Sequence, residues 1–409
     1  MGMIVNPYIL ASTAPFHHYA LAKGDNTDIV DAGSIHSGGT MTVPANWNGR
    51  YARYTAGYWE SHGSGGDLTY SGRKGGSNFD GSGIEISAQT STVHGGPIIC
   101  APIPVTSGDT FTTAGLGGLS GHGNWSCLEV MPAGFKGALV NRVSTGFSVG
   151  ASETTVEWNN EIYDTDGYHD NSTNPSRLTV PSGSSGLTRI CGSIVVAAGG
   201  GECGIVLYKN GSVLASLVQF DTIKNAINFM SQPLAVSTGD YFEVKVYTTS
   251  ATTVSVSNNS WLSIEELPSS LKYAIARVTT NQSIPSGVVM TSFIGNTEEV
   301  DVGGWFTAGG SNFVVPSGIS LVRFGMFGTK TGSSGDFHCS MRVNATEGPG
   351  MAKGSSISGP SLDFAHCVSG ILAVSAGDTI DWYAATNAGA QSIRTFSFCW
   401  IEEVPAVTS

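Results

Sequence analysis

Three short landmarks recur in the same order and at a nearly constant spacing along this chain of 409 residues. Each copy has a Val-Pro pair, then a Gly-Asp pair, then an apolar segment that carries a glutamate. The landmark prolines, aspartates and glutamates are Pro44, Asp109 and Glu129 in the first copy, Pro181, Asp240 and Glu265 in the second, and Pro316, Asp378 and Glu402 in the third. The prolines and the glutamates both recur after about 136 residues, and a fixed order at one period indicates a structural module that is present three times.

Three modules of about 136 residues would fill the chain, and each would have the usual size of a domain with its own core. We therefore predict three domains, at residues 1–133, 134–269 and 270–409. The connecting segments at residues 131–136 and 268–272 are short. At roughly 3.5 Å per residue each connector reaches no more than about 20 Å, so neighbouring modules are expected to touch or nearly touch.

The composition and the pattern of apolar residues predict an all-β fold. The chain contains 55 glycines and 40% hydrophobic residues but only 12% charged residues, which favours short strands joined by tight turns and argues against disorder. No segment has a sustained apolar stripe at the 3.6-residue period of a helix. Residues 241–248 instead alternate, with Phe242, Val244 and Val246 on one face and polar residues on the other.

Further strands are expected where apolar and β-branched residues gather. They are predicted at residues 51–59, 98–103, 110–130, 187–198, 204–208, 321–328, 337–343 and 379–384. The sequence Lys-Asn-Gly-Ser at 209–212 predicts a hairpin turn, since Asn-Gly accepts positive φ at low cost. The polar, glycine-rich stretches at 60–96 and 346–360 are predicted to be long loops, mobile or functional. Residues 1–27 hold either the first strand or an arm that docks on a partner, and we favour the strand.

Charge and the start of the sequence argue against two classes of partner. The formal net charge is −12 and the chain has no block of lysines or arginines, so we expect no nucleic-acid partner. The sequence begins without a basic segment, and its first apolar run is too short for a signal peptide or a membrane span, so we expect no membrane association. Seven cysteines without dense spacing indicate free thiols packed as small apolar groups, which suits assembly in a reducing cytoplasm.

The second repeat carries the most specific pattern. It contains EIYDTDGYHDNSTNPSRLTVPSG at residues 161–183, then the hairpin LYKNGS, then LAVSTGDYFEVKVY and a closing apolar strand. This order of acidic turn, Val-Pro strand end, Asn-Gly hairpin and Gly-Asp turn resembles the C1q/TNF-like jelly roll over about 120 residues. Repeats 1 and 3 keep only the landmarks, and both have a glycine, Gly33 or Gly303, in place of the second aspartate of DTDG.

The resemblance implies three tandem jelly-roll β-sandwich domains, each with ten strands in two sheets, packed around a threefold axis. Modules of this kind are common in bacteriophage virion proteins, including head decorations, head fibres and tail fibres. By this association we expect a non-enzymatic structural protein, assembled in the host cytoplasm and exposed on the virion surface as a head decoration, cement or head-fibre protein. It would stabilise the capsid by binding capsid or other virion proteins, or contact the host surface. The alternative is a tail-fibre or adhesin protein that binds host surface polysaccharide as a receptor.

The sequence leaves two possible assemblies. Three chains can stack module on module as a homotrimer, or the three repeats of one chain can form an intramolecular pseudo-trimer. We expect the homotrimer, because the repeats have diverged strongly. Such divergence is expected if the modules are stacked along a stalk, where each module would contact a different neighbour.

One acidic motif is a candidate metal site. Asp164, Asp166 and Asp170 in DTDGYHD offer oxygen ligands of the kind that Ca²⁺ prefers, although their spacing departs from an EF-hand loop. A structural turn is the favoured interpretation. No other cofactor is expected, and without a Gly-x-Ser-x-Gly elbow or a Walker-type phosphate loop we expect no catalytic residue.

The landmark residues themselves are predicted to shape turns and strand ends. In these positions glycine supplies positive φ, aspartate accepts backbone N–H bonds, and proline withholds a donor. The residues with this predicted structural role are Asp31, Gly33, Pro44, Gly108, Asp109, Pro181, Gly239, Asp240, Asp301, Pro316, Gly377 and Asp378.

Four aromatic residues are candidates for binding a ligand, because aromatic rings can stack on sugar rings. They are Trp47, Tyr58 and Trp59 in repeat 1 and Trp305 in repeat 3. The alternative, which we favour, places them in cores or subunit contacts, where large aromatic side chains are commonly buried.

Overall fold

The fold is described from a computed structural model of the chain. The residues that the structure describes are 19–23, 28–31, 36–37, 40–61, 67–88, 93–115, 125–143, 146–184, 186–195, 203–221, 224–248, 252–254, 257–285, 287–292, 297–307, 310–331, 337–346, 353–356, 363–386, 391–395 and 397–405. Residues 1–27 contain a strand at Tyr19–Lys23, in agreement with the favoured prediction, whereas the apolar segment at residues 4–10 lies outside the described ranges.

The prediction of an all-β fold is confirmed, because the described residues form strands and a single short 3₁₀ helix. Repeat 1 contains β1 (Tyr19–Lys23), β2 (Asp28–Asp31), β3 (His36–Ser37), β4 (Thr40–Thr42), η1 (Ala45–Trp47), β5 (Tyr51–Ser61), β6 (Asp67–Lys74), β7 (Ile84–Ala88), β8 (Val93–Ile99), β9 (Ile103–Pro104), β10 (Thr110–Gly115) and β11 (Trp125–Val130). Repeat 2 contains β12 (Gly137–Arg142), β13 (Phe147–Val149), β14 (Thr154–Thr155), β15 (Asn160–Asp164), β16 (Arg177–Thr179), β17 (Leu187–Val195), β18 (Cys203–Lys209), β19 (Ser212–Asp221), β20 (Lys224–Met230), β21 (Leu234–Ala235), β22 (Tyr241–Thr248), β23 (Thr252–Val254) and β24 (Ser257–Glu266). Repeat 3 contains β25 (Tyr273–Arg277), β26 (Gln282–Ile284), β27 (Gly287–Ser292), β28 (Thr297–Val302), β29 (Asn312–Val314), β30 (Leu321–Lys330), β31 (Phe337–Val343), β32 (Lys353–Ser356), β33 (Asp363–Val368), β34 (Leu372–Ala373), β35 (Thr379–Thr386), β36 (Gln391–Ile393) and β37 (Phe398–Glu403).

The same strand pairing occurs in each repeat. One sheet, called the inner sheet here, has the order β2-β1-β11-β5-β8 in repeat 1 and β15-β12-β24-β17-β20 in repeat 2. In repeat 3 it consists of β28-β25-β37-β30, with β33 pairing on the other side of β30. The facing outer sheet has the orders β4-β10-β6-β7, β16-β22-β18-β19 and β29-β35-β31-β32. All of these pairs are antiparallel, and each repeat is a β-sandwich of two such sheets.

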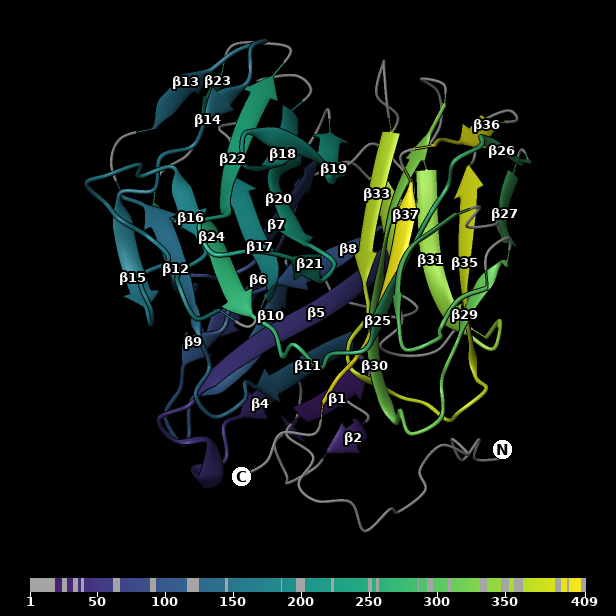
Figure 1. Cartoon of the computed structure of the whole chain (residues 1–409), viewed down its shortest axis with the longest axis horizontal. Helices are drawn as coiled ribbons and strands as arrows, with labels where there is room; N and C mark the ends of the chain where they lie inside the picture. Colours follow the sequence, from purple (N-terminus) through teal and green to yellow (C-terminus); the bar gives the residue numbers. More distant parts are fainter. Residues whose placement is uncertain are drawn as a thin grey trace.

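The three sandwiches lie against one another rather than in a row. Figure 1 shows repeat 2 in teal on the left, repeat 3 in green and yellow on the right, and β5 and β11 of repeat 1 below and between them. Repeats 1 and 2 also share a continuous sheet, because β20 pairs with β7 in register positions that join Lys224 to Ser87 and Ala226 to Ile86. Strand β7, at the edge of the outer sheet of repeat 1, is thereby paired with β20 of the inner sheet of repeat 2. This pairing removes an exposed sheet edge.

The first two landmarks of each repeat are hydrogen-bonded to each other. In repeat 2 the N–H of Val180 donates to the carbonyl of Asp240 at 2.7 Å, and the N–H of Gly239 donates to the carbonyl of Val180 at 2.9 Å. The same two bonds join Val43 to the Gly108-Asp109 turn and Val315 to the Gly377-Asp378 turn, at 2.8 and 2.9 Å in both cases. The residue after each valine donates no backbone N–H in this pairing. Proline, which has no backbone N–H, is therefore acceptable at that position.

The local predictions hold best in the outer sheet of repeat 2. Strand β22 has the expected alternation, with Phe242, Val244 and Val246 fully buried. The hairpin between β18 and β19 turns at Asn210 and Gly211, with φ of 53° and 76°.

Two predicted loops are wrong. The stretch at 60–96 contains β6, β7 and the start of β8, and the stretch at 346–360 contains β32. Strands β6 and β32 are mainly polar and β8 contains two adjacent glycines, so these three lack the apolar alternation that identifies a strand in sequence, whereas β7 has only the short alternation Ile84-Glu85-Ile86. Backbone pairing in the structure identifies them as strands. For example, β6 lies between β7 and β10 in the outer sheet.

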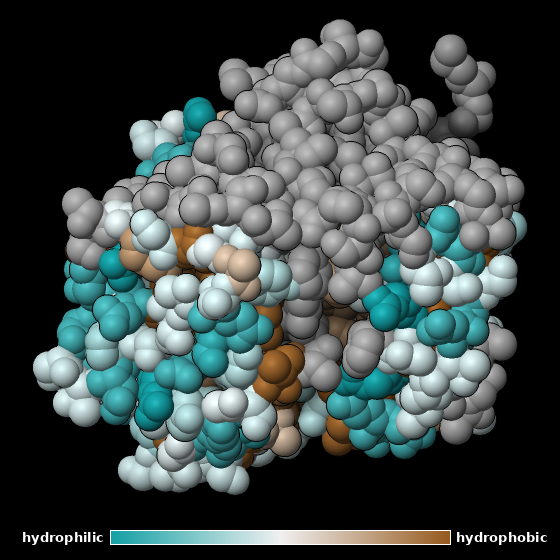
Figure 2. Space-filling view, turned by 90° about the horizontal axis from the view of Figure 1, so that it is seen from above, coloured by the Kyte–Doolittle hydropathy of each residue, from teal (hydrophilic) through white to brown (hydrophobic). Residues whose placement is uncertain are grey.

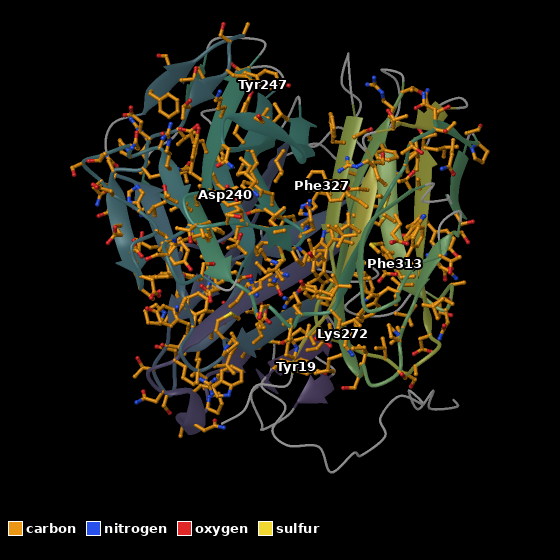
Figure 3. All side chains as sticks on the ribbon, viewed as in Figure 1. Tyr19, Asp240, Tyr247, Lys272, Phe313 and Phe327 are labelled. Carbon is orange, nitrogen blue, oxygen red and sulfur yellow. The ribbon has the colours of Figure 1, made fainter. Side chains whose placement is uncertain are left out.

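The hydrophobic cores of the repeats merge where the inner sheets meet. One buried cluster extends from repeats 1 and 2 to Phe327, Phe398 and Trp400 of repeat 3, and a second extends from repeat 3 to Leu21 and Trp125 of repeat 1. Figure 3 shows Phe327 on the side of repeat 3 that faces repeat 2. Seen from above in Figure 2, one group of hydrophobic residues is visible between the left and right parts of the molecule. The central strands of the inner sheets, such as β17 and β30, are thus buried on both faces.

Candidate functional site

Three arginines and three glutamates meet where the inner sheets converge, and each repeat supplies one of each. The six residues, called the charge ring here, are Arg53 and Glu129 from repeat 1, Arg189 and Glu265 from repeat 2, and Arg323 and Glu402 from repeat 3. Their side chains are between 2% and 7% exposed. The ring is therefore almost completely removed from water.

Strand pairing places the two members of each repeat side by side. Arg53 on β5 is directly opposite Glu129 on β11 in the register of the sheet. In the same way, Arg189 on β17 is opposite Glu265 on β24, and Arg323 on β30 is opposite Glu402 on β37. Because successive side chains of a strand point to opposite faces, the neighbours Ala52 and Tyr54 pack into the sandwich while Arg53 points away from it.

The ring closes through ion pairs within and between repeats. Within repeats, the shortest distances are 2.7 Å from Arg53 Nε to Glu129 Oε1, 3.0 Å from Arg189 Nη1 to Glu265 Oε1, and 3.2 Å from Arg323 Nη1 to Glu402 Oε1. Between repeats, Arg53 Nη1 is 2.9 Å from Glu265 Oε1, Arg189 donates to Glu402, and Arg323 donates to Glu129. Each glutamate accepts from two arginines, one of its own repeat and one of another, so that all three repeats are linked in a cycle.

The three glutamates are not electrostatically equivalent. Burial alone would raise the pKa of Glu129, but the charges of Arg323 and Arg53 lower that pKa to about 2. The pKa of Glu265 is also lowered, because the charges of Arg53 and Arg189 outweigh the effect of burial. For Glu402 burial has the larger effect and raises the pKa above its usual value. The carboxylate of repeat 3 is therefore the most easily protonated member of the ring.

Sequence reasoning found the glutamates of the ring only as landmarks and missed its arginines. The signal was present, because Arg53, Arg189 and Arg323 recur at nearly the same period as the landmarks. Each lies among largely apolar residues at the start of its strand, and in β17 it is the only charged residue. Since an arginine is almost never fully buried without a partner, a recurrent arginine at these positions indicates a recurrent partner.

A cavity of about 250 Å³ lies against the charge ring. Its lining includes all six ring residues together with residues 130–133, 266–268 and 403–405, Phe135 and Leu271. These are the ends of the three closing strands and the connectors that follow two of them. The cavity thus lies where the three repeats meet, and every repeat contributes to it.

Two of the three candidate calcium ligands, Asp164 and Asp170, are occupied by their own turns, and the carboxylate of Asp166 accepts from the Thr165 hydroxyl at 2.7 Å. Asp164 accepts backbone N–H bonds from Asp166, Gly167 and His169 at 2.8–3.1 Å. Asp170 accepts from the backbone of Ser172 and Thr173 and from the Ser172 hydroxyl, which together lower its pKa to about 2. Within the described ranges no group of three histidine, cysteine, aspartate or glutamate side chains is arranged to hold a metal ion. The geometry of these carboxylates is that of turn caps.

Aspartates at the other landmark turns make the same kind of contact. Asp109 accepts from the N–H of Thr106 at 2.7 Å, Asp240 from Ser237 at 2.9 Å, and Asp378 from Ser375 at 2.8 Å. The glycine before each of them, Gly108, Gly239 and Gly377, has a φ between 86° and 90°. Asp301 accepts from the N–H groups of Gly304, Trp305 and Phe306, as Asp164 does in repeat 2. Pro44, Pro181 and Pro316 follow the valines that pair with these turns. Gly33 and the side chain of Asp31 lie outside the described part of the chain.

The aromatic candidates separate into two groups. Trp47 and Trp305 are each 1% exposed, so their rings are not available to a ligand at the surface. Trp305 also donates its indole N–H to the carbonyl of Val302 at 3.3 Å. Tyr58 and Trp59 belong to β5, but their side chains lie outside the described part, so a role in binding stays a prediction for them.

Comparisons with known proteins give weak likenesses. No protein-family model and no curated protein matches the chain. Among solved structures, murine APRIL at pH 8.0 aligns over 32% of this chain and 99% of its own, with 14% identity and a TM-score of 0.27. The N-terminal CBM22-1-CBM22-2 tandem domain of Paenibacillus barcinonensis Xyn10C aligns over 67% of this chain and 100% of its own, with 11% identity and a TM-score of 0.20. The insecticidal δ-endotoxin Cry8Ea1 of Bacillus thuringiensis aligns over 54% of this chain and 52% of its own, with 8% identity and a TM-score of 0.21. At these scores the likenesses say nothing about function. In the described part, no helix is long and apolar enough to cross a membrane.

Proposed function

We propose that this chain is a non-enzymatic structural protein of a bacteriophage particle, in which three C1q/TNF-like jelly rolls form one intramolecular pseudo-trimer. The observation that carries the pseudo-trimer is the charge ring, because one chain supplies all six members and leaves none of their charges unpaired. Its place would be the virion surface, as a head decoration or head-fibre protein that binds capsid or other virion proteins.

The ring favours this assembly over the homotrimer of stacked modules. Isolating one repeat from the other two would leave Arg189 with only one of its two carboxylates and expose the apolar inner sheet around it. Breaking a buried ion pair by removing one partner is costly, because a charge is left uncompensated in a low-dielectric site. Packing the repeats of one chain against one another gives each of the three guanidinium groups two carboxylates at once.

The arrangement of polar groups supports a scaffold rather than a reaction centre. The landmark aspartates bind backbone N–H groups of their own turns, and every ring carboxylate is held by two guanidinium groups. A catalytic carboxylate needs a free oxygen that faces its substrate. The particle itself is inferred from the resemblance of the second repeat to modules that are common in phage virion proteins.

Two experiments test this proposal separately. Multi-angle light scattering on the purified chain is expected to give a mass near 42.4 kDa, and about three times that mass would contradict the pseudo-trimer. Particles produced with and without the gene for this protein are then compared by electron microscopy and by loss of DNA on heating. The proposal expects extra density on the outer surface and greater heat resistance when the protein is present. Identical particles in both preparations, with no protein sedimenting with them, would contradict the virion role.

A further inference from the structure

Two cysteine side chains meet in the core of repeat 3. Cys339 lies on β31 of the outer sheet, and Cys367 lies on β33, which pairs with β30 of the inner sheet. Their sulfur atoms are 3.7 Å apart, and both residues are fully buried. The contact joins the two facing sheets of one sandwich through residues that are 28 positions apart in the chain.

The strand register fixes the positions of both thiols. Cys339 is opposite Ala384 of β35, and Cys367 is opposite Met326 of β30. Residues at alternate positions of β31, Phe337 among them, belong with Cys339 to the buried core of the repeat. Because each thiol is one bond away from a backbone held by sheet pairing on both sides of its residue, the contact does not depend on a long, flexible side chain.

A third thiol lies nearby but is placed differently. Cys399 on β37 is opposite Met326 from the other side, so β30 separates it from Cys367. Two strand spacings in a sheet are about 10 Å, which is too far for a direct bond between those two cysteines. Within the described ranges no three histidine, cysteine, aspartate or glutamate side chains are arranged to hold a metal ion. The geometry therefore favours a pair of thiols, Cys339 with Cys367.

The pair is stable as thiols while no oxidant is present. Burial raises the pKa of Cys367 well above its ordinary value, and the contact with Cys339 acts in the same direction. Since the thiolate is the reactive form, both sulfur atoms react slowly. A disulfide bond is about 2.05 Å long, so the two sulfur atoms would have to approach each other by about 1.7 Å. Immunoglobulin domains show that one disulfide can bridge the two sheets of a β-sandwich.

From this contact we propose that Cys339 and Cys367 are an oxidation site, where a small peroxide converts the two thiols into a disulfide that joins and stabilises the sheets of repeat 3. Hydrogen peroxide first oxidises one thiol to a sulfenic acid; its O–O bond breaks and one water is released. The sulfur of the second thiol then attacks the sulfenic sulfur, which forms the S–S bond and releases a second water. Two thiols and one hydrogen peroxide thus give one disulfide and two waters.

The disulfide would close a loop that contains β32, the strand at the end of the outer sheet. A cross-link of this kind stabilises a fold mainly because it restricts the unfolded chain. The inference goes beyond the scaffold role and does not depend on the phage particle. It is tested on the isolated chain, so a failure of the virion role leaves it standing.

The test treats the reduced, folded chain with a small excess of hydrogen peroxide, well below its thermal midpoint, and then blocks the remaining thiols with N-ethylmaleimide. Trypsin places the three cysteines of this core on separate peptides, at residues 331–342, 354–394 and 395–409. Mass spectrometry without reductant is expected to show the first two peptides joined, and dithiothreitol should separate them. The thermal midpoint of the oxidised chain should be higher by about 5 °C or more.

Two results would overturn the proposal. One is that Cys339 and Cys367 are both recovered with the maleimide label, or as separate sulfinic or sulfonic acids. The other is that the joined peptides include residues 395–409 instead of 354–394. The same treatment in urea is the reference for pairing without a fold, and there several different linkages among the seven cysteines are expected. A native chain that gives the same mixture would also count against the proposed contact.

A matched pair of variants separates the site from its surroundings. Cys367→Ala should abolish both the joined peptides and the rise in thermal midpoint. Cys399→Ala removes a buried thiol from the same core and should keep both. The thermal midpoint of each reduced variant shows whether it is folded, and Cys339→Ala replaces Cys367→Ala if the latter is not. Loss of the linkage in folded Cys399→Ala, or an oxidised natural chain that is linked but no more stable than the reduced one, would contradict the proposal.

Discussion

Arg53 and Glu129 face each other on neighbouring strands of one repeat, and the guanidinium of Arg53 also binds Glu265 of the next repeat. One side chain therefore serves the sheet of its own repeat and the contact between repeats. Because both remaining repeats have the same arrangement, a change at any ring position affects two repeats at once. The ring is thus the place where folding of the repeats and their assembly are coupled.

The glutamates of the ring should differ in their importance for stability. Glu129→Gln is expected to lower the free energy of unfolding by about 3–5 kcal/mol, since it leaves two buried guanidinium groups short of a counter-charge. Glu402→Gln should cost clearly less, because burial already disfavours the charged form of Glu402 and raises its pKa. Urea unfolding followed by tryptophan fluorescence measures both variants. Equal losses for the two would show that the ring members are equivalent after all.

Acid should weaken the fold through the same group. The pKa of Glu129 is lowered to about 2 in the folded chain, below its ordinary value of 4.5, so its contribution is complete above about pH 4.5 and is lost as the pH falls toward 2. Glu265 acts in the same direction. The contribution of Glu129 to this loss is on the order of 3 kcal/mol. The measurement is the urea midpoint at pH 5 and at pH 2.5, for the natural chain and for Glu129→Gln, whose pH dependence should be smaller.

Gly137 should not tolerate a side chain. A Cβ at this position would lie 2.3 Å from the carbonyl oxygen of Ile264, in the backbone of the neighbouring strand, and 3.0 Å from the ring of Phe135. Gly137→Ala is therefore expected to cost about 1–3 kcal/mol by forcing β12 away from β24. Gly150→Ala is the matched control, because a Cβ at Gly150 has no heavy atom within 4 Å. A loss within about 0.5 kcal/mol for Gly137→Ala would contradict the packing described.

The receptor-binding alternative has its own test in Trp59. If the protein binds host surface polysaccharide through the aromatic residues of β5, Trp59→Ala should abolish binding on a glycan array. The control is Trp305→Phe, a change inside the core of repeat 3, where the ring is buried and does not reach a ligand. A scaffold without this activity predicts that neither the natural chain nor the variants bind any glycan.

Sequence patterns predicted strands of both sheets, including those at 187–198 and 241–248, and missed β6, β7 and β32 of the outer sheets. Strand β22 faces the core with one side and water with the other, so its alternation is visible in the sequence. Strand β17 is buried at every position, because one face packs in its own sandwich and the other against the neighbouring repeats. Such a strand has no polar face to mark its period, and its partner surface cannot be recognised from the strand alone.

The candidate site was only half predictable for a related reason. The glutamates at 129, 265 and 402 were visible as a landmark, but a landmark does not show what it contacts. The contact between Arg53 and Glu265 joins residues 212 positions apart, and only the packing of whole repeats brings them together. The recurrence of arginine at the same period was the available signal. A contact between repeats becomes predictable from sequence only when two residues that both recur at the repeat period are considered together.

Linking the repeats in one polypeptide changes what dilution can do to the ring. An association of separate subunits weakens as their concentration falls, whereas contacts inside a single chain form at a rate and to an extent that do not depend on how much protein is present. The covalent link also frees each position around the axis to vary by itself. A substitution that suits one contact between repeats need not be imposed on the other two, so three faces of unequal character can develop around a common centre.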